Sequence, residues 1–122
     1  MPIWIYVFLG GGLGSVARWT TAKWLSPSSD HAFPIGTFTA NLIACLILGL
    51  LIGYQLKHPI QHQYRLFLMV GFCGGFSTFS TFSAETFNLL RAGQLSMAFG
   101  YVAISLLFGL VAVFAGIKIC EY

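Results

Sequence analysis

Four long apolar runs occupy most of this chain, and they constrain its fold more than any other feature. A helix that spans a bilayer needs roughly 20 mostly apolar residues. Runs of that length fall at about residues 3–23, 35–56, 66–90 and 95–119. Only 7% of the 122 residues are charged, against about 25% in soluble domains. The sequence therefore predicts an all-α membrane protein with four transmembrane helices in a single domain, residues 1–122, and not a soluble enzyme.

Other classes of protein fit the pattern less well. A transmembrane β-barrel alternates apolar and polar residues along each strand, and the runs at 43–54 and 101–117 do not alternate. The first run has no basic region before it and no small-residue cleavage site after it, so we expect a retained helix and not a signal peptide. The net charge of +3 is small and dispersed, which gives no support to nucleic-acid binding.

The cysteines and histidines do not form a recognisable disulfide or metal-binding pattern. The cysteines are odd in number and lie in or near apolar runs, where we expect them to act as packing residues. The histidines lie in loops without a matching cluster of cysteine or acid, so metal binding there is not expected. The residues concerned are Cys45, Cys73, Cys120, His31, His58 and His62.

Small residues provide the expected means of holding the helices together. Helices in lipid associate through small residues that let their backbones approach closely, because lipid tails are as apolar as leucine. The chain has 14 glycines, and several are spaced as GxxxG. These pairs are Gly10/Gly14, Gly49/Gly53 and Gly71/Gly75.

Three polar residues lie within or at the ends of the apolar runs, where they are costly and therefore functional candidates. Asn41 lies inside the second run, and its amide offers two N–H donors for a ligand or for an interhelical hydrogen bond. Arg18 lies near the end of the first run, and we favour a structural role, either snorkelling to the interface or pairing with a backbone carbonyl. Glu85 follows the polar part of the third run and lines a vestibule or caps a helix at the interface.

The third run contains the strongest signal, the stretch GFCGGFSTFSTFS from Gly71 to Ser83. Gly74-Gly75 followed by Ser77-Thr78 predicts a broken helix at membrane depth. A broken helix is tolerated there only when protein, water or an ion satisfies the freed backbone groups. Freed carbonyls suit a hard cation such as Na⁺, as in the discontinuous helices of transporters.

The same stretch repeats Phe-Ser-Thr with a period of three. In a helix each triplet drifts by only about 60°, so Phe76, Phe79 and Phe82 are expected to form one slowly wrapping stripe. Hydroxyls and the positive edges of aromatic rings favour an anion, and the groups do not select which small anion. Helix association and aromatic packing alone remain the alternative. The hydroxyl stripes beside the rings consist of Ser77, Ser80 and Ser83 and of Thr78 and Thr81.

These motifs together resemble the Fluc (CrcB-type) family of bacterial fluoride channels. The likeness covers essentially the whole chain, through GGGLGSVARW at 10–19, GTFTAN at 36–41 and the long, specific GFCGGFSTFSTFSAE at 71–85. The resemblance implies a multi-pass protein of the bacterial inner membrane that lowers cytoplasmic fluoride by passive export. It also implies an antiparallel, dual-topology homodimer with two pores and one central, non-transported Na⁺.

The resemblance further assigns roles to individual residues. Gly74 and Ser77 match the positions whose backbone carbonyls hold Na⁺. The family usually has Thr-Thr before Phe-Ser where this chain has Ser77-Thr78, a change that a carbonyl ligand survives. The residues assigned to the fluoride pathway are Asn41, Phe79, Phe82, Ser80, Thr81, Tyr101 and Ser105.

Two other functions were weighed against this one. A small multidrug transporter is also a short four-helix protein of dual topology, but it needs a membrane-embedded Glu on the first helix, and residues 3–23 contain no acid. A purely structural membrane protein would not need Asn41 or the Phe-Ser-Thr stripe.

The distribution of positive charge bears on orientation. Four spans place both termini on one side, together with Lys57, Arg65 and Lys118. The opposite side receives the other three basic residues, so the Lys/Arg bias that orients membrane proteins is absent. Insertion in both orientations is therefore expected. The three residues on the opposite side are Arg18, Lys23 and Arg91.

Overall fold

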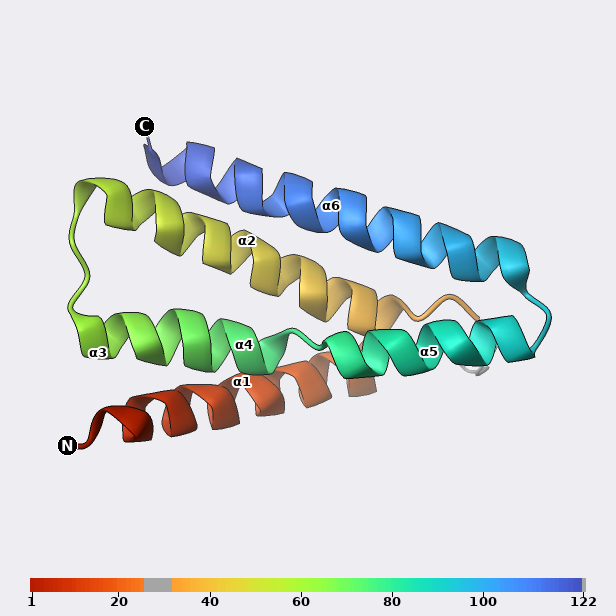
Figure 1. Ribbon diagram of the computed structural model, residues 1–122, viewed down its shortest axis with the longest axis horizontal. Coiled ribbons are helices and arrows are strands. Elements are labelled where there is room, and N and C mark those ends of the chain that lie inside the picture. The colour runs from red at the N-terminus through yellow and green to blue at the C-terminus, as the bar shows by residue number, and fades with distance from the viewer. Residues whose placement is uncertain (26–31, 122) are drawn as a thin grey trace.

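The computed structural model describes residues 1–25 and 32–121, and within these ranges every regular element is a helix. Four antiparallel rods are arranged as a bundle, with both termini at the same end (Figure 1). The third rod is composite, because α3, η1, α4 and α5 follow one another along it. The elements are α1 (Ile3–Leu25), α2 (Ile35–Lys57), α3 (His62–Arg65), the π-helix η1 (Leu66–Cys73), α4 (Gly74–Phe76), α5 (Phe79–Arg91) and α6 (Leu95–Glu121).

Three of the rods are long and apolar enough to cross a membrane: Ile35–Lys57, His62–Arg91 and Leu95–Glu121. The first rod, α1, has 23 residues, which at 1.5 Å per residue is about 35 Å and long enough to span. It does not reach the same hydropathy, because Arg18, Lys23 and its glycines dilute the apolar residues. The first loop, residues 26–31, and with it His31, lies outside the described residues.

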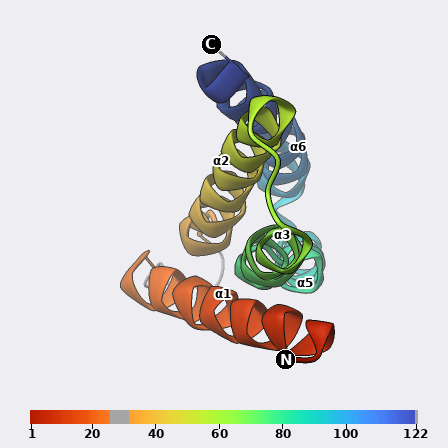
Figure 2. The same ribbon diagram turned by 90° about the vertical axis from the view of Figure 1, so that its left-hand side faces the viewer.

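Helix α1 packs against the first half of the composite rod through glycines (Figure 2). A methyl group added at Gly14 would clash with the carbonyl oxygen of Phe72, and one added at Gly10 would clash with that of Phe67. A methyl at Gly75 would in turn meet the carbonyl of Gly11. Two of the three glycine pairs therefore face each other across a single contact, where any side chain would separate the backbones.

The remaining glycine pair joins α2 to α6 in a second extensive helix contact. A methyl group added at Gly49 would clash with the carbonyl oxygen of Val113, and one added at Gly53 would clash with that of Ile117. Gly116 on α6 approaches the backbone of α2 in the same way. The bundle thus consists of two glycine-packed pairs, α2 with α6 and α1 with the composite rod.

The predicted break in the third rod is present, but it lies after the glycines and not at them. Gly74 is helical, with φ −65° and ψ −36°. The backbone becomes extended at Ser77 (φ −80°, ψ 157°) and Thr78 (φ −151°, ψ 117°), and α5 begins at Phe79. The glycines serve instead for close approach to α1. The eight residues before them form a π-helix, a wider helix that is often found near functional sites.

The break also divides the expected phenylalanine stripe. Phe76 ends α4, where it is 6% exposed and packs against Ala40 and Ala44 of α2. Phe79 begins α5 and is 80% exposed. The stripe of three was predicted for a continuous helix, and two extended residues between Phe76 and Phe79 place their rings on different surfaces.

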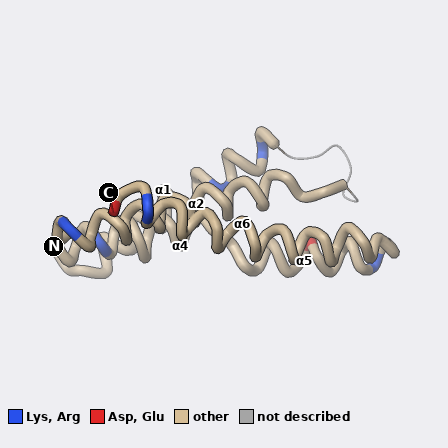
Figure 3. Tube along the Cα trace, turned by 90° about the horizontal axis from the view of Figure 1, so that it is seen from above, with Lys and Arg blue, Asp and Glu red and all other residues tan. Residues whose placement is uncertain are grey.

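Most of the Lys and Arg residues lie near the ends of their helices (Figure 3). Cationic side chains there lie over aromatic rings of the same helix: Lys23 over Trp19, Arg91 over Phe87 and Lys118 over Phe114. Such pairs are typical of the interface between membrane and water, where amphipathic rings are enriched.

Candidate functional site at the helix break

The side-chain amide of Asn41 on α2 forms hydrogen bonds with the backbone at the break. Its Oδ1 accepts a hydrogen bond from the backbone N–H of Thr78 at 2.7 Å, and its Nδ2 donates to the Thr78 carbonyl at 3.3 Å. The side chain therefore replaces, on both sides of one residue, the bonds that a continuous helix would make. An interhelical hydrogen bond of this kind was the alternative to a ligand-binding role for Asn41 in the sequence analysis. One N–H of the amide remains for another acceptor.

The hydrogen bonds at the break release two backbone carbonyls. In an unbroken helix the N–H of Thr78 would bond the carbonyl of Gly74, and the N–H of Thr81 would bond that of Ser77. Here the Thr78 N–H bonds Asn41, and the Thr81 N–H bonds the Thr78 hydroxyl at 3.2 Å. Gly74 and Ser77, the two positions assigned to a cation, thus lose their helical donors. Backbone carbonyls in this state suit a hard cation.

Arg18 satisfies the carbonyl between them. Its Nε donates to the Gly75 carbonyl at 3.0 Å, in a partly buried contact that joins α1 to α4. This corresponds to the backbone-carbonyl option of the structural role expected for Arg18. The guanidinium is therefore held against the backbone of α4.

Three aromatic rings continue from the break toward the end of the bundle. The centroids of Phe79 and Phe82 lie 6.0 Å apart with their planes at 39°. The Phe82 ring lies 5.0 Å from that of Tyr101 on α6. Phe79 presents its ring to the outside of the single chain, whereas Tyr101 is completely buried.

The hydroxyl of Tyr101 connects this aromatic series to Glu85. It donates to Oε1 of Glu85 at 3.2 Å, and the buried Thr37 side chain lies beside both residues. Glu85 thus lies inside the bundle and beside the expected pathway residues. Thr37 was missed in the sequence, although it precedes Asn41 by four residues and so occupies the same face of α2.

Asn41 and Ser105 meet at a small cavity of about 30 Å³ between α2 and α6. The hydroxyl oxygen of Ser105 is buried and has no hydrogen-bond partner among the described residues. The space exceeds the volume of roughly 10–15 Å³ that a water molecule requires. The other residues that line the cavity are Phe38, Leu42, Cys45 and Gly109.

The hydroxyls of the Phe-Ser-Thr repeat have separate roles. Ser77 donates to the Cys73 carbonyl at 2.8 Å and Thr78 caps α5, so both act within the backbone. The exposed Ser80 lies 3.3 Å from the Thr78 hydroxyl, while Thr81 contributes its N–H to the cap. A single hydroxyl stripe does not run through the break.

Within the described ranges, His, Cys, Asp and Glu side chains nowhere gather in groups of three that could hold a metal. Cys45, Cys73 and Cys120 are free thiols. A cation at the break would therefore depend on neutral oxygen atoms, such as backbone carbonyls.

The chain is similar to known proteins over nearly its whole length. The model of a family described as CrcB-like protein, Camphor Resistance (CrcB), matches residues 5–117. A protein of Flavobacterium psychrophilum, named fluoride-specific ion channel FluC, is 41% identical over 117 residues, or 95% of this chain and 94% of that one. Proteins with the same name from Bacteroides fragilis (45% identity, covering 92% and 91%) and Pseudomonas fluorescens Pf0-1 (39%, covering 99% and 98%) are also similar.

Proposed function

Because the chain belongs to the CrcB-like family, we propose that it is a fluoride-specific ion channel, and that it works as an antiparallel pair of copies holding one sodium ion. It is a multi-pass protein of a bacterial membrane and not an enzyme. The observation that carries the channel function is similarity to fluoride-specific channels over 92–99% of the chain, which includes every residue around the break.

The residues along the break suit a small anion. Fluoride is strongly hydrated, so a pathway must replace its water with close donors. The free N–H of Asn41 and the unpartnered hydroxyl of Ser105 are such donors, and the edges of Phe79 and Phe82 are weakly positive. None of these groups carries a full positive charge, so each holds an anion weakly enough to release it. Fluoride flows passively down its gradient, which exports it when the cytoplasmic concentration is higher.

The test of this function is anion efflux from liposomes that contain the purified protein. Vesicles loaded with fluoride should release it when the membrane potential is clamped by a potassium ionophore, and vesicles loaded with chloride should retain it. Protein-free vesicles give the background leak. Equal release of the two anions would reject fluoride selectivity, and release of neither would reject the channel.

The second copy in this proposal is supported by what one chain leaves uncovered. The Phe79 ring is 80% exposed, and a methyl group at Gly74 would meet nothing within 4 Å. An anion pathway that opened sideways to lipid would lose its selectivity, and a second copy would close it. In this arrangement α1 completes four spans, with its Arg18 hydrogen-bonded to the Gly75 carbonyl.

An inverted arrangement of the two copies is supported by the even charge distribution. Arg18 is hydrogen-bonded to the backbone of α4 and is left out of the comparison. One side of the membrane then has two basic residues, Lys23 and Arg91, and the other has three, Lys57, Arg65 and Lys118. Lys118 is also paired with Glu121 at 3.4 Å. A difference of one exposed charge gives little orientation bias.

Dual topology is tested by labelling a single cysteine placed in the first loop, in a protein that lacks the three native cysteines. An impermeable thiol reagent applied from either side of the membrane should label part of the population. Labelling from one side alone would exclude an inverted pair.

The sodium ion of the proposal would be held by the carbonyls of Gly74 and Ser77 from both copies on the two-fold axis. The ion would supply positive charge to carbonyls that lipid cannot satisfy. The melting temperature of the purified protein should then rise with sodium concentration and not with choline. The variant Ser77→Ala should keep this dependence, because only the carbonyl is used. Identical melting in the two salts would refute the site.

A further inference from the structure

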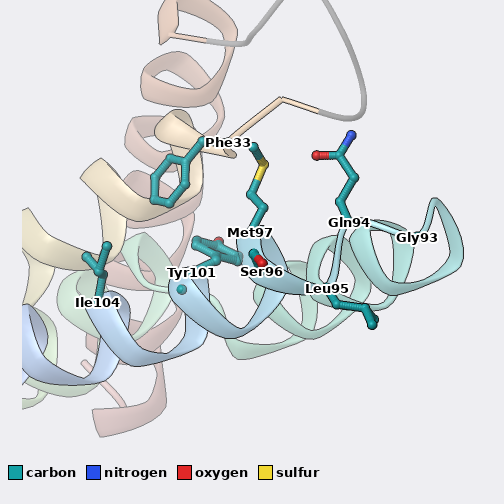
Figure 4. A pocket seen from close by; sticks show the side chains of 9 residues that line it. Phe33, Gly93, Gln94, Leu95, Ser96, Met97, Tyr101 and Ile104 are labelled. Atoms are coloured by element: carbon teal, nitrogen blue, oxygen red, sulfur yellow. The ribbon is translucent and has the colours of Figure 1, made fainter.

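An open groove of about 550 Å³ lies at the end of the bundle, beside the first turns of α6. Its walls include Gln94, Met97, Gly100 and Ile104 of the α5–α6 loop and α6. Figure 4 shows the Phe33 ring, which comes from the segment before α2, facing α6 near Tyr101. Tyr101 therefore separates this groove from the rings of the proposed pathway.

Phe33 is the aromatic contact of Tyr101 on the groove side. The two ring centroids lie 5.3 Å apart with planes at 80°, an edge-to-face arrangement. Phe33 makes a second contact of this kind with Phe38 of α2, at 5.7 Å and 69°. On the other side Tyr101 touches Phe82 and bonds Glu85. One buried tyrosine thus links Phe33 to two residues of the site.

The backbone at Phe33 is joined directly to the start of α2. The Phe33 carbonyl accepts a bond from the Ile35 N–H at 2.8 Å, and the buried Pro34 is the N-cap residue of α2. The ring is therefore fixed relative to α2, the helix that carries Thr37 and Asn41. Tyr101 belongs to α6, so the Phe33 contact sets the position of the phenol relative to α2.

We propose that Phe33 is a positioning residue of the fluoride pathway, which holds the Tyr101 ring against Phe82 and its hydroxyl on Glu85. The inference rests on the proposed channel function. Tyr101 already lines the groove beside Phe33, so loss of the Phe33 ring would widen the groove there and give the Tyr101 side chain room to turn away from Glu85. The pathway would then lose the geometry of its outermost ring while the helices stayed in place.

The test compares fluoride efflux from liposomes for Phe33→Leu, which keeps an apolar side chain and removes the ring. We expect flux to fall roughly 2- to 12-fold, the range that loss of one aromatic pair gives. Phe33→Tyr keeps the ring and should retain most of the flux. Phe99→Leu is the matched control, because Phe99 lies two residues from Tyr101 on α6 and is 68% exposed.

A double-mutant comparison shows whether Phe33 acts through Tyr101. In a Tyr101→Leu background, which lacks both the ring and the hydroxyl, Phe33→Leu should cause little further loss. An equal loss in both backgrounds, or wild-type flux in Phe33→Leu, would overturn the inference while the wild-type efflux still supports the channel. Elution volume and melting temperature identify a variant that fails to fold, and in that case a Phe33→Tyr protein that folds but conducts poorly would also overturn it.

Discussion

Replacing Gly14 by alanine is expected to separate α1 from the composite rod. The new methyl group would clash with the Phe72 carbonyl oxygen and lie 2.8 Å from the backbone nitrogen of Phe76. Both obstacles are backbone atoms, which cannot turn aside as a flexible side chain does. The helices must therefore move apart, and overpacking of this kind costs about 1–3 kcal/mol.

Gly12 provides a matched control on the same helix. A methyl group there meets nothing within 4 Å, so Gly12→Ala changes only the backbone preference. Alanine is favoured over glycine within a helix by about 0.5–1 kcal/mol, and this gain applies to both variants. The difference in unfolding free energy between them therefore isolates the overpacking cost, about 1–3 kcal/mol in favour of Gly12→Ala.

Intrinsic fluorescence provides the assay, because all three tryptophans, Trp4, Trp19 and Trp24, lie on α1. Unfolding in mixed micelles with rising denaturing detergent should show Gly14→Ala losing its native signal first, and Gly12→Ala no earlier than wild type. If Gly14→Ala were as stable as Gly12→Ala, the close approach of α1 to Phe72 and Phe76 would be refuted.

Three further predictions concern the break and its surroundings. Phe79→Ile and Phe82→Ile should each lower fluoride efflux while elution as a dimer is retained, because isoleucine keeps bulk and removes the ring edge; wild-type flux in both would remove these rings from the pathway. Asn41→Ala removes both bonds to Thr78, so the unfolding free energy should fall by roughly 1 kcal/mol in mixed micelles, and fluoride efflux should fall too; unchanged stability would contradict a stabilising role of Asn41 at the break. Gly74→Leu should leave the monomer folded and shift elution toward it, and an intact dimer would place the interface elsewhere.

The helices could be predicted from the sequence because lipid imposes a length and a composition on each span. The expected bounds 35–56 and 95–119 agree closely with Ile35–Lys57 and Leu95–Glu121. Which helices pair could not be predicted, since every GxxxG pair offers the same kind of surface. The choice depends on the fit of whole backbones, which the spacing of glycines does not contain.

The position of the break was harder to predict than its existence. The sequence predicted a break over Gly74-Gly75 and the Ser77-Thr78 that follows, with no reason to prefer one pair. The structure breaks at Ser77 and Thr78, because Asn41 supplies a competing partner from 37 residues away. A period of three in the sequence carries no information about such a partner. The predicted stripe of three phenylalanines was therefore wrong for Phe76, which lies on the other side of the break.

Long-range contacts also explain what was incomplete at the site. Phe79 and Phe82, predicted together from the sequence, form one series of rings with Tyr101, which was named separately on another helix. The hydrogen bond from Tyr101 to Glu85 and the buried position of Thr37 follow from the packing of α2, α5 and α6. This packing could not be predicted from the local sequence.

Interrupting the third rod creates two helix ends facing each other inside the membrane. Peptide dipoles add along a helix, giving roughly half a positive charge at its amino end and half a negative charge at its carboxyl end. The carboxyl end here is α4, where Gly74 and Ser77 would hold sodium, and the amino end is α5, which begins at Phe79. A single gap in one helix therefore offers partial charges of both signs, one suited to a resident cation and the other to a passing anion.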